Sequence, residues 1–366
     1  MMNLQFFPSR QIAFYMARMF VVRTLSVLAA LVLILATLDV LGESGDILTV
    51  PGNGDAELWR YVSLRIPMII QRFLPFSVLL GTLITLATLN QHSEVVSMKA
   101  AGISAHQIIA PLIVASLGIA TVSFAFNERI VTRAAGTLSA WEKVDYGPVP
   151  RDTGMKPDVW VRFGDDLIHA RRVIGAGAAT RLAGITIYDR DWETLVKVVE
   201  AERARPDGGA WRLEGARLFD VAAGGTRTAH PVIEYGRGLD PIQFTLADVD
   251  PEEQDFATLN DSIEQLKNAG RPTSALESGL WHKLSGPLSA VLMPLLAGVA
   301  AFGLARSGQL FLRAVIGMAL GFAYFVADNF ALAMGNLGAY PPLLAAWAPF
   351  LLFLLIGEAV LIRTEE

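Results

Sequence analysis

Cysteine is absent from the 366 residues of this chain. Its absence excludes disulfides, thiolate metal sites and a cysteine nucleophile, so any part in an oxidising compartment must fold without covalent cross-links. Charge is also scarce, because Asp, Glu, Lys and Arg make up only 18% of the residues and the formal net charge is -5. Such a charge provides no electrostatic basis for binding nucleic acid.

Motifs for catalysis and nucleotide binding are missing as well. The chain has no G-x-x-x-x-G-K-[ST] loop, so any ATP that drives it must be hydrolysed by another chain. The patterns H-E-x-x-H, G-x-S-x-G and S-x-x-K do not occur either. We therefore expect no enzymatic activity, no cofactor and no metal site.

Long apolar segments are what the sequence does contain. A helix needs about 20 apolar residues to cross a bilayer. Six segments reach that length, at residues 18–41, 66–90, 108–126, 284–304, 310–334 and 343–362. The first is too long for a signal-peptide core and has no small-residue cleavage site. The predicted fold class is a membrane protein with six transmembrane helices, three on each side of a long polar insert.

Basic residues predict the orientation, because cytoplasmic loops carry an excess of Lys and Arg. The residues that would share one side are Arg10, Arg18, Arg23, Lys99, Arg306, Arg313 and Arg363. The connection at 335–342 between the last two spans has no basic residue. We predict that both termini are cytoplasmic and that the insert lies outside, although three arginines near the start of the second span lie on the outer side.

The insert has the pattern of an all-β domain. Short runs rich in β-branched and aromatic residues, bounded by Gly, Asp and Pro, occur at 159–163, 167–174, 184–188, 194–199 and 210–213. Asp207-Gly208 predicts a hairpin, and residues 261–269 predict an amphipathic helix that leads back to the membrane. The predicted domains are 1–129 with three spans, 130–271 as a jelly-roll-like β domain, and 272–366 with three more spans.

A short amphipathic helix is predicted at about 91–102, in the loop after the second span. Val95 and Met98 recur at helical spacing, and Ser93 is a suitable N-cap. Glu94 lies in the first turn, where the helix dipole favours a carboxylate, and Gly102 is a natural C-terminal stop. Two interpretations remain open. The helix fits into a groove of a cytosolic partner, or it only closes the loop at the membrane surface.

Three segments resemble a known family. Residues 88–104 (TLNQHSEVVSMKAAGIS) are similar to the SE-containing segment of the LptF/LptG permeases, the membrane part of the lipopolysaccharide-export ABC transporter. Trp281-His282-Lys283-Leu284 with Pro287 looks like that family's entry to its fourth helix, and residues 335–349 look like the LptG form of its last turn. The resemblance covers essentially the whole chain and includes the order of three helices, periplasmic jelly roll and three helices.

The resemblance implies a function and partners. The chain would extract lipopolysaccharide from the inner membrane of a Gram-negative bacterium and pass it to a periplasmic bridge. It would form a heterodimer with an LptF-like permease, bind a cytoplasmic LptB-like ATPase dimer, and work with LptC- and LptA-like proteins. The residues that would couple it to the ATPase are Ser93, Glu94, Val95, Met98, Lys99 and Gly102.

Candidate lipid contacts do not follow from a motif. Between Arg23 and Arg60 there is no Lys or Arg, so the basic residues described near helix 1 of some relatives have no counterpart. The arginines that our topology places near the outer surface are Arg60, Arg65, Arg72, Arg129 and Arg133. They are either phosphate contacts or interfacial anchors. The ionisable or polar residues of the outer span halves are Asp39, Asp328 and Asn329, which either line the lipid cavity or pair between helices.

Two other functions are compatible with part of this pattern. One is the permease of a different ABC exporter of the mechanotransmission type, although such proteins usually have four spans with the large domain after the first. The other is a membrane-anchored assembly protein that transports nothing. An assembly protein would need no helix that couples to an ATPase.

Overall fold

The computed structural model describes residues 8–148, 155–175, 177–192, 194–221, 225–246, 249–303 and 310–365. The chain divides into a helical unit and a β unit, and each is described by itself. Within the described residues, six helices are long and apolar enough to cross a membrane. The prediction of six spans with an inserted β domain is therefore confirmed.

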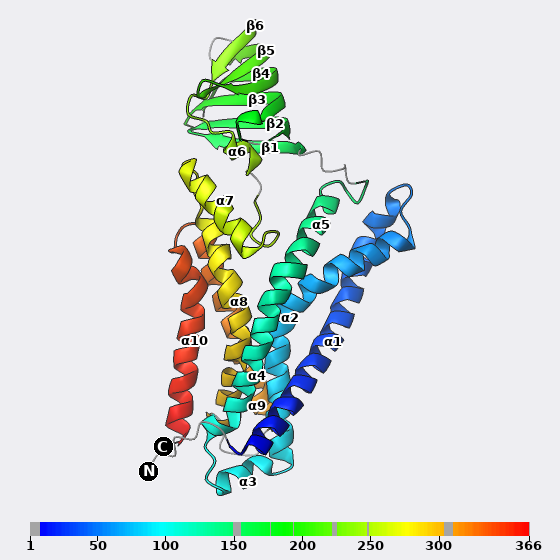
Figure 1. Ribbon diagram of the computed structural model, residues 1–366, viewed down its shortest axis with the longest axis vertical. Coiled ribbons are helices and arrows are strands. Elements are labelled where there is room, and N and C mark those ends of the chain that lie inside the picture. Colours follow the sequence, from blue (N-terminus) through cyan, green and yellow to red (C-terminus); the bar gives the residue numbers. More distant parts are fainter. Residues whose placement is uncertain are drawn as a thin grey trace. The chain divides into compact units, whose positions relative to one another are not determined.

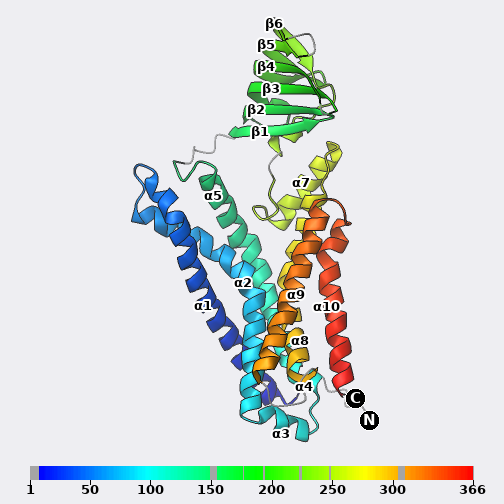
Figure 2. The same cartoon turned by 180° about the vertical axis from the view of Figure 1, so that it is seen from behind.

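The helical unit contains long helices that run side by side (Figures 1 and 2). Its elements before the insert are α1 (Arg10–Thr49), α2 (Asp55–Gln91), α3 (Glu94–Ala100), α4 (Ala105–Phe126), the π-helix η1 (Asn127–Val131) and α5 (Thr132–Glu142). Those after it are α8 (Ser274–Gly298), the π-helix η3 (Val299–Gly303), α9 (Leu310–Asn336) and α10 (Pro342–Glu365).

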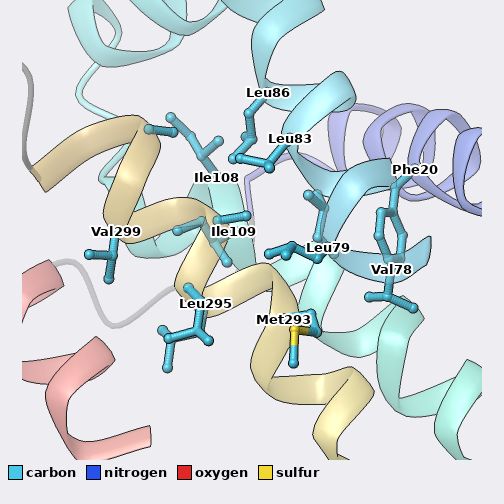
Figure 3. Packing of buried hydrophobic residues seen from close by; sticks show 14 of the residues in the cluster. Phe20, Val78, Leu79, Leu83, Leu86, Ile108, Ile109, Met293, Leu295 and Val299 are labelled. Carbon is cyan, nitrogen blue, oxygen red and sulfur yellow. The ribbon is translucent and has the colours of Figure 1, made fainter. Parts of the chain in front are cut away.

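The core of this unit is centred on α8, the most buried of the candidate spans. α8 packs against α2, α4, α9 and α10. Figure 3 shows Leu79 and Leu83 of α2 close to Ile109 of α4 and Leu295 of α8. In contrast, α1 and α9 leave most of their apolar surface uncovered, as expected of helices that face lipid or a partner.

Glycines allow close helix packing at two crossings. A Cβ at Gly81 of α2 would lie 2.3 Å from the hydroxyl oxygen of Thr24 on α1. Gly317 and Gly321 form a G-x-x-x-G pair on α9, where a Cβ would lie 2.7 Å from Leu83 and 2.3 Å from Leu79 of α2. Small residues at these points let the backbones approach, which is how spanning helices associate without a hydrophobic driving force.

The third span continues beyond Ile130, where the sequence predicted the insert to begin. Through η1 it runs on as α5 to Glu142. Leu138 and Trp141 of α5 are buried in a second, smaller core with Ile47 of α1 and Tyr61 of α2. This packing keeps a weakly apolar segment helical, because tertiary contacts override local propensity. The described strands begin only at Met155.

The β unit is one antiparallel sheet in the sequential order β1 to β6, so its connections are those of a meander. The strands are β1 (Met155–Phe163), β2 (Asp166–Ile174), β3 (Arg181–Asp191), β4 (Thr194–Asp207), β5 (Ala210–Asp220) and β6 (Thr226–Tyr235). The sixth was missed in the sequence, since most of its side chains are exposed and it lacks a continuous apolar run. The hairpin at Asp207-Gly208 is confirmed, because Asp207 pairs with Ala210.

One face of the sheet carries the core of this unit. Val161, Ile168 and Ile187 are buried there, and Phe244 of the short helix α6 (Ile242–Thr245) packs edge-on against Trp211.

Helix α7 (Phe256–Asn268) contains the predicted amphipathic segment almost entirely, with Ile263 and Leu266 buried. Asp255 precedes α7 and accepts a hydrogen bond from the backbone N–H of Thr258, which lowers the pKa of that carboxyl.

Candidate functional site

Helix α3 is held between α2 and α4 by well-defined ends. At its C-terminus, Gly102 adopts φ +83° and donates its N–H to Lys99, while Ile103 donates to Met98. This is a Schellman motif, and it explains the need for glycine. At the N-terminus, Ser93 occupies the N-cap position with φ 57°, but its side chain makes no capping hydrogen bond. Ser93 thus occupies the predicted N-cap position, but its side chain does not cap the helix.

The two faces of α3 have different surroundings. Val95 and Met98 are buried in the core of the helical unit, so they fix α3 to the membrane helices. Val96 on the other face is 63% exposed, and Ser97 and Lys99 are also exposed. An exposed apolar side chain close to Ser97 and Lys99, on a helix whose opposite face is buried, is suited to docking in a groove of another protein.

Two contacts link α3 to distant parts of the chain. The hydroxyl of Tyr15 on α1 lies 3.3 Å from the Glu94 carboxylate and donates a hydrogen bond to it. The Lys99 ammonium lies 5.0 Å from the centre of the Phe302 ring, at the end of the fourth span. Neither Tyr15 nor Phe302 was identified from the sequence, because the chain separation hides both contacts. Helix α3 is therefore in direct contact with both α1 and η3.

The outer end of α1 is joined to α2 by a polar cluster. The Asp39 carboxylate accepts two hydrogen bonds from the Arg65 guanidinium, at 2.8 and 3.1 Å, and one from the Tyr61 hydroxyl at 2.7 Å. The bidentate geometry is the strong form of this interaction. Of the two interpretations of Asp39, pairing between helices describes this contact, and Arg65 is the partner. Glu43, one turn further along α1, accepts a hydrogen bond from Tyr146, and burial together with this bond raises the pKa of Tyr146.

The other four candidate arginines differ in whether their guanidinium groups have a partner within the chain. The Arg60 guanidinium lies 4.6 Å above the Trp141 ring, which holds it against α5. Arg72, Arg129 and Arg133 are exposed, and within the described ranges no carboxylate pairs with them. Arg129 and Arg133 lie one helical turn apart across η1 and α5. These three are the cations left available for an external anion.

Asp328 and Asn329 of α9 point in different directions. Asp328 is mostly buried, and its carboxylate lies 3.9 Å from His282 of α8. Asn329 is exposed, and its side-chain amide donates to the carbonyl of Phe325 on the same helix. Asp328 therefore faces another helix of this chain, whereas Asn329 faces outward.

Comparison with known proteins decides the family. The family model described as "Lipopolysaccharide export system permease LptF/LptG" matches residues 14–363. The chain belongs to this family. It is thus a multi-pass membrane protein of the lipopolysaccharide export system, a transporter subunit without a catalytic domain.

Individual relatives of this LptF/LptG permease agree with the family model. The lipopolysaccharide export system permease protein LptG of Escherichia coli K12 is 26% identical over 309 residues, which cover 83% of this chain and 84% of that protein. The LptG protein of Haemophilus influenzae is 28% identical over 333 residues, or 86% and 89% of the two chains.

A buried ion pair in this LptF/LptG permease was also missed by the sequence. Lys283 of α8 is 6% exposed and lies 3.6 Å from the Glu128 carboxylate of η1, which is 16% exposed. The other oxygen of Glu128 accepts a hydrogen bond from the backbone N–H of Phe256 at the start of α7. One carboxylate therefore joins the third span, the fourth span and the segment that returns from the insert. In the sequence only Lys283 was named, as part of the segment before the fourth span, and in the structure the π-helical turn η1 marks the position of Glu128.

Two arginines that the orientation prediction used fall outside the description. Arg306 lies outside the described residues, and the side chain of Arg313 is likewise not described.

Within the described part of the chain, no group of three or more His, Asp or Glu side chains is arranged to hold a metal ion.

Proposed function

We propose that this permease extracts lipopolysaccharide from the inner membrane of a Gram-negative bacterium and passes it to a periplasmic bridge. In this proposal it fills the position of LptG, the name of the curated relatives. It forms a heterodimer with an LptF-like permease, and LptC- and LptA-like proteins receive the lipid. The uncovered apolar surfaces of α1 and α9 support this, since they are suited to a second permease and to acyl chains.

The observation that carries the proposal is the construction of α3. It is anchored by Val95 and Met98, exposes Val96 and Lys99, and touches both α1 and η3. Because the chain has no nucleotide-binding loop, the energy must come from another protein. We infer that α3 fits into one subunit of an LptB-like ATPase dimer and transfers its movement to the membrane helices. Ser93 and Gly102 set the ends of the element that docks.

Charge supports the orientation and a route for the lipid. Arg10, Arg18, Arg23 and Lys99 belong to the end that we assign to the cytoplasm, together with both termini. Of the eight residues considered as lipid contacts, Arg72, Arg129 and Arg133 are the best supported as phosphate ligands, because they are exposed and unpaired among the described residues. Asp39, Arg65 and Arg60 would act by holding the outer ends of α1, α2 and α5 together.

Charge reversal at Glu94 tests the coupling function. We expect Glu94→Lys to leave the protein inserted but to weaken binding of the ATPase and lipopolysaccharide export, because reversing a charge within an interface commonly costs several kcal/mol. The measurements are co-purification of the ATPase with the tagged permease and lipopolysaccharide release from spheroplasts.

Tyr15→Phe is the matched control for this test. It removes the intramolecular hydrogen bond but keeps the charge of Glu94. If the carboxylate contacts the ATPase, Tyr15→Phe retains binding and Glu94→Lys loses it. Equal losses in both variants would show that Glu94 acts through Tyr15 and not through a partner, and wild-type behaviour of Glu94→Lys would refute the coupling assignment.

A further inference from the structure

The first turns of α1 form a groove with α4 that the transport mechanism does not use. The groove has a volume of about 560 Å³. Its lining includes Arg10, Gln11, Phe14 and Ala17 of α1 and Val114 and Ala115 of α4. This volume is within the range of about 300–1,000 Å³ that is common for small-molecule sites.

Residue size explains why the groove exists. Met16 and Phe20, on another face of α1, are buried in the core and fix the position of the helix. On the groove face, Ala17 of α1 and Ala115 of α4 are too small to fill the space between the helices. Phe14 at its border is 70% exposed. Residues 10–17 precede the apolar segment 18–41, whereas Val114 lies within the segment 108–126, so the groove lies where the first span enters the bilayer and an amphiphile has both its environments.

Charge indicates the head group of the occupant. Arg10 lies in the first turn of α1, where the helix dipole also favours an anion and no acidic residue is present. Arg10 and Arg18 are both exposed, and across the described part of the chain neither pairs with a carboxylate. A guanidinium at the membrane surface is well suited to bind a phosphodiester.

We propose that this groove binds an anionic glycerophospholipid of the adjoining leaflet. Its phosphate contacts Arg10, and one acyl chain lies along Phe14, Ala17 and Val114. The bound lipid stabilises the start of α1 against α4. The neighbouring Tyr15 donates its hydrogen bond to Glu94, so the lipid also supports the position of α3. This inference requires only a membrane-spanning chain and does not depend on the transported substrate.

Photo-crosslinking in nanodiscs tests the proposal. The permease in its complex is reconstituted with trace photoactivatable phosphatidylglycerol or with phosphatidylcholine that carries the same acyl chains. We expect phosphatidylglycerol to label the peptides that contain Ala17 and Val114 more strongly than phosphatidylcholine. Arg10→Gln should lower that labelling about fivefold, the factor that corresponds to about 1 kcal/mol per basic residue at an anionic surface.

Matched variants separate this site from ordinary boundary lipid. Ala115→Leu fills the groove and should reduce labelling, whereas Ala29→Leu adds the same volume on an exposed position of α1 and should not. Arg363→Gln removes an exposed cation from the last turn of α10 and should also have no effect. The proposal is overturned by equal labelling with both lipids, by unchanged labelling in Arg10→Gln, or by crosslinks from the groove to a polypeptide in place of lipid.

Discussion

At the scale of single residues, the ion pair between Glu128 and Lys283 carries the clearest energetic consequence. Both side chains are largely buried, and Glu128 also accepts the N–H of Phe256. Removing one partner of a buried pair leaves an uncompensated charge, which commonly costs about 3–5 kcal/mol. We therefore expect Lys283→Ala to lower the free energy of unfolding by about that amount, as measured by chemical unfolding of the purified permease in detergent.

A double substitution distinguishes charge burial from the loss of packing. Glu128→Gln combined with Lys283→Met keeps both volumes and the acceptor for Phe256, and it should unfold within about 1 kcal/mol of wild type. Arg133→Ala, which removes an exposed cation, should change stability by less than about 0.5 kcal/mol. If the double variant were as unstable as Lys283→Ala, the charge pair would not be the cause.

At the scale of elements, the contact between α9 and α2 depends on two glycines. A Cβ at Gly321 would lie 2.3 Å from buried Leu79, too close unless one of the helices moves. We expect Gly321→Val to destabilise the permease by about 1–3 kcal/mol, the usual range for overpacking, and to reduce export. Thermal unfolding of the detergent-purified complex measures the first effect.

A compensating substitution on α2 tests the same contact between α9 and α2. Gly321→Val combined with Leu79→Ala restores the space and should recover part of the stability. Ala323→Val places the same side chain on an exposed position of α9 and is the control. Equal stability of Gly321→Val and Ala323→Val would show that the two helices do not need this close approach.

At the scale of the whole molecule, transport of a large amphiphile requires an opening to the bilayer, and we propose that it lies beside α1 and α9. A photoreactive residue at Thr37 of α1 or at Val326 of α9 should therefore capture lipopolysaccharide when ATP is hydrolysed. Leu355 of α10 is the control, because it is 68% exposed, compared with 50% for Val326, and so meets membrane lipid at least as well. Equal labelling at all three positions, or labelling that does not depend on ATP, would count against lateral entry.

Much of this architecture was readable from the sequence because its signals are local. The six spans, the strand-rich insert, the hairpin at Asp207-Gly208 and the stop of α3 at Gly102 each follow from a few consecutive residues. Hydrophobic length, strand composition and glycine geometry act within one element, so they do not depend on the rest of the fold. The family could be recognised for the same reason, since its motifs are short.

Only the tertiary structure decided how the ionisable side chains are used. The sequence left Asp39 and Asp328 between two interpretations, and it treated Val95 and Met98 only as part of the coupling helix. It named Lys283 in a family motif but did not pair it with Glu128. The structure pairs Asp39 with Arg65, places Asp328 near His282, joins Glu128 to Lys283, and buries Val95 and Met98 of α3. These outcomes depend on which helices meet and in what rotation. That arrangement is set by packing between segments far apart in the chain, where no local pattern records the partner.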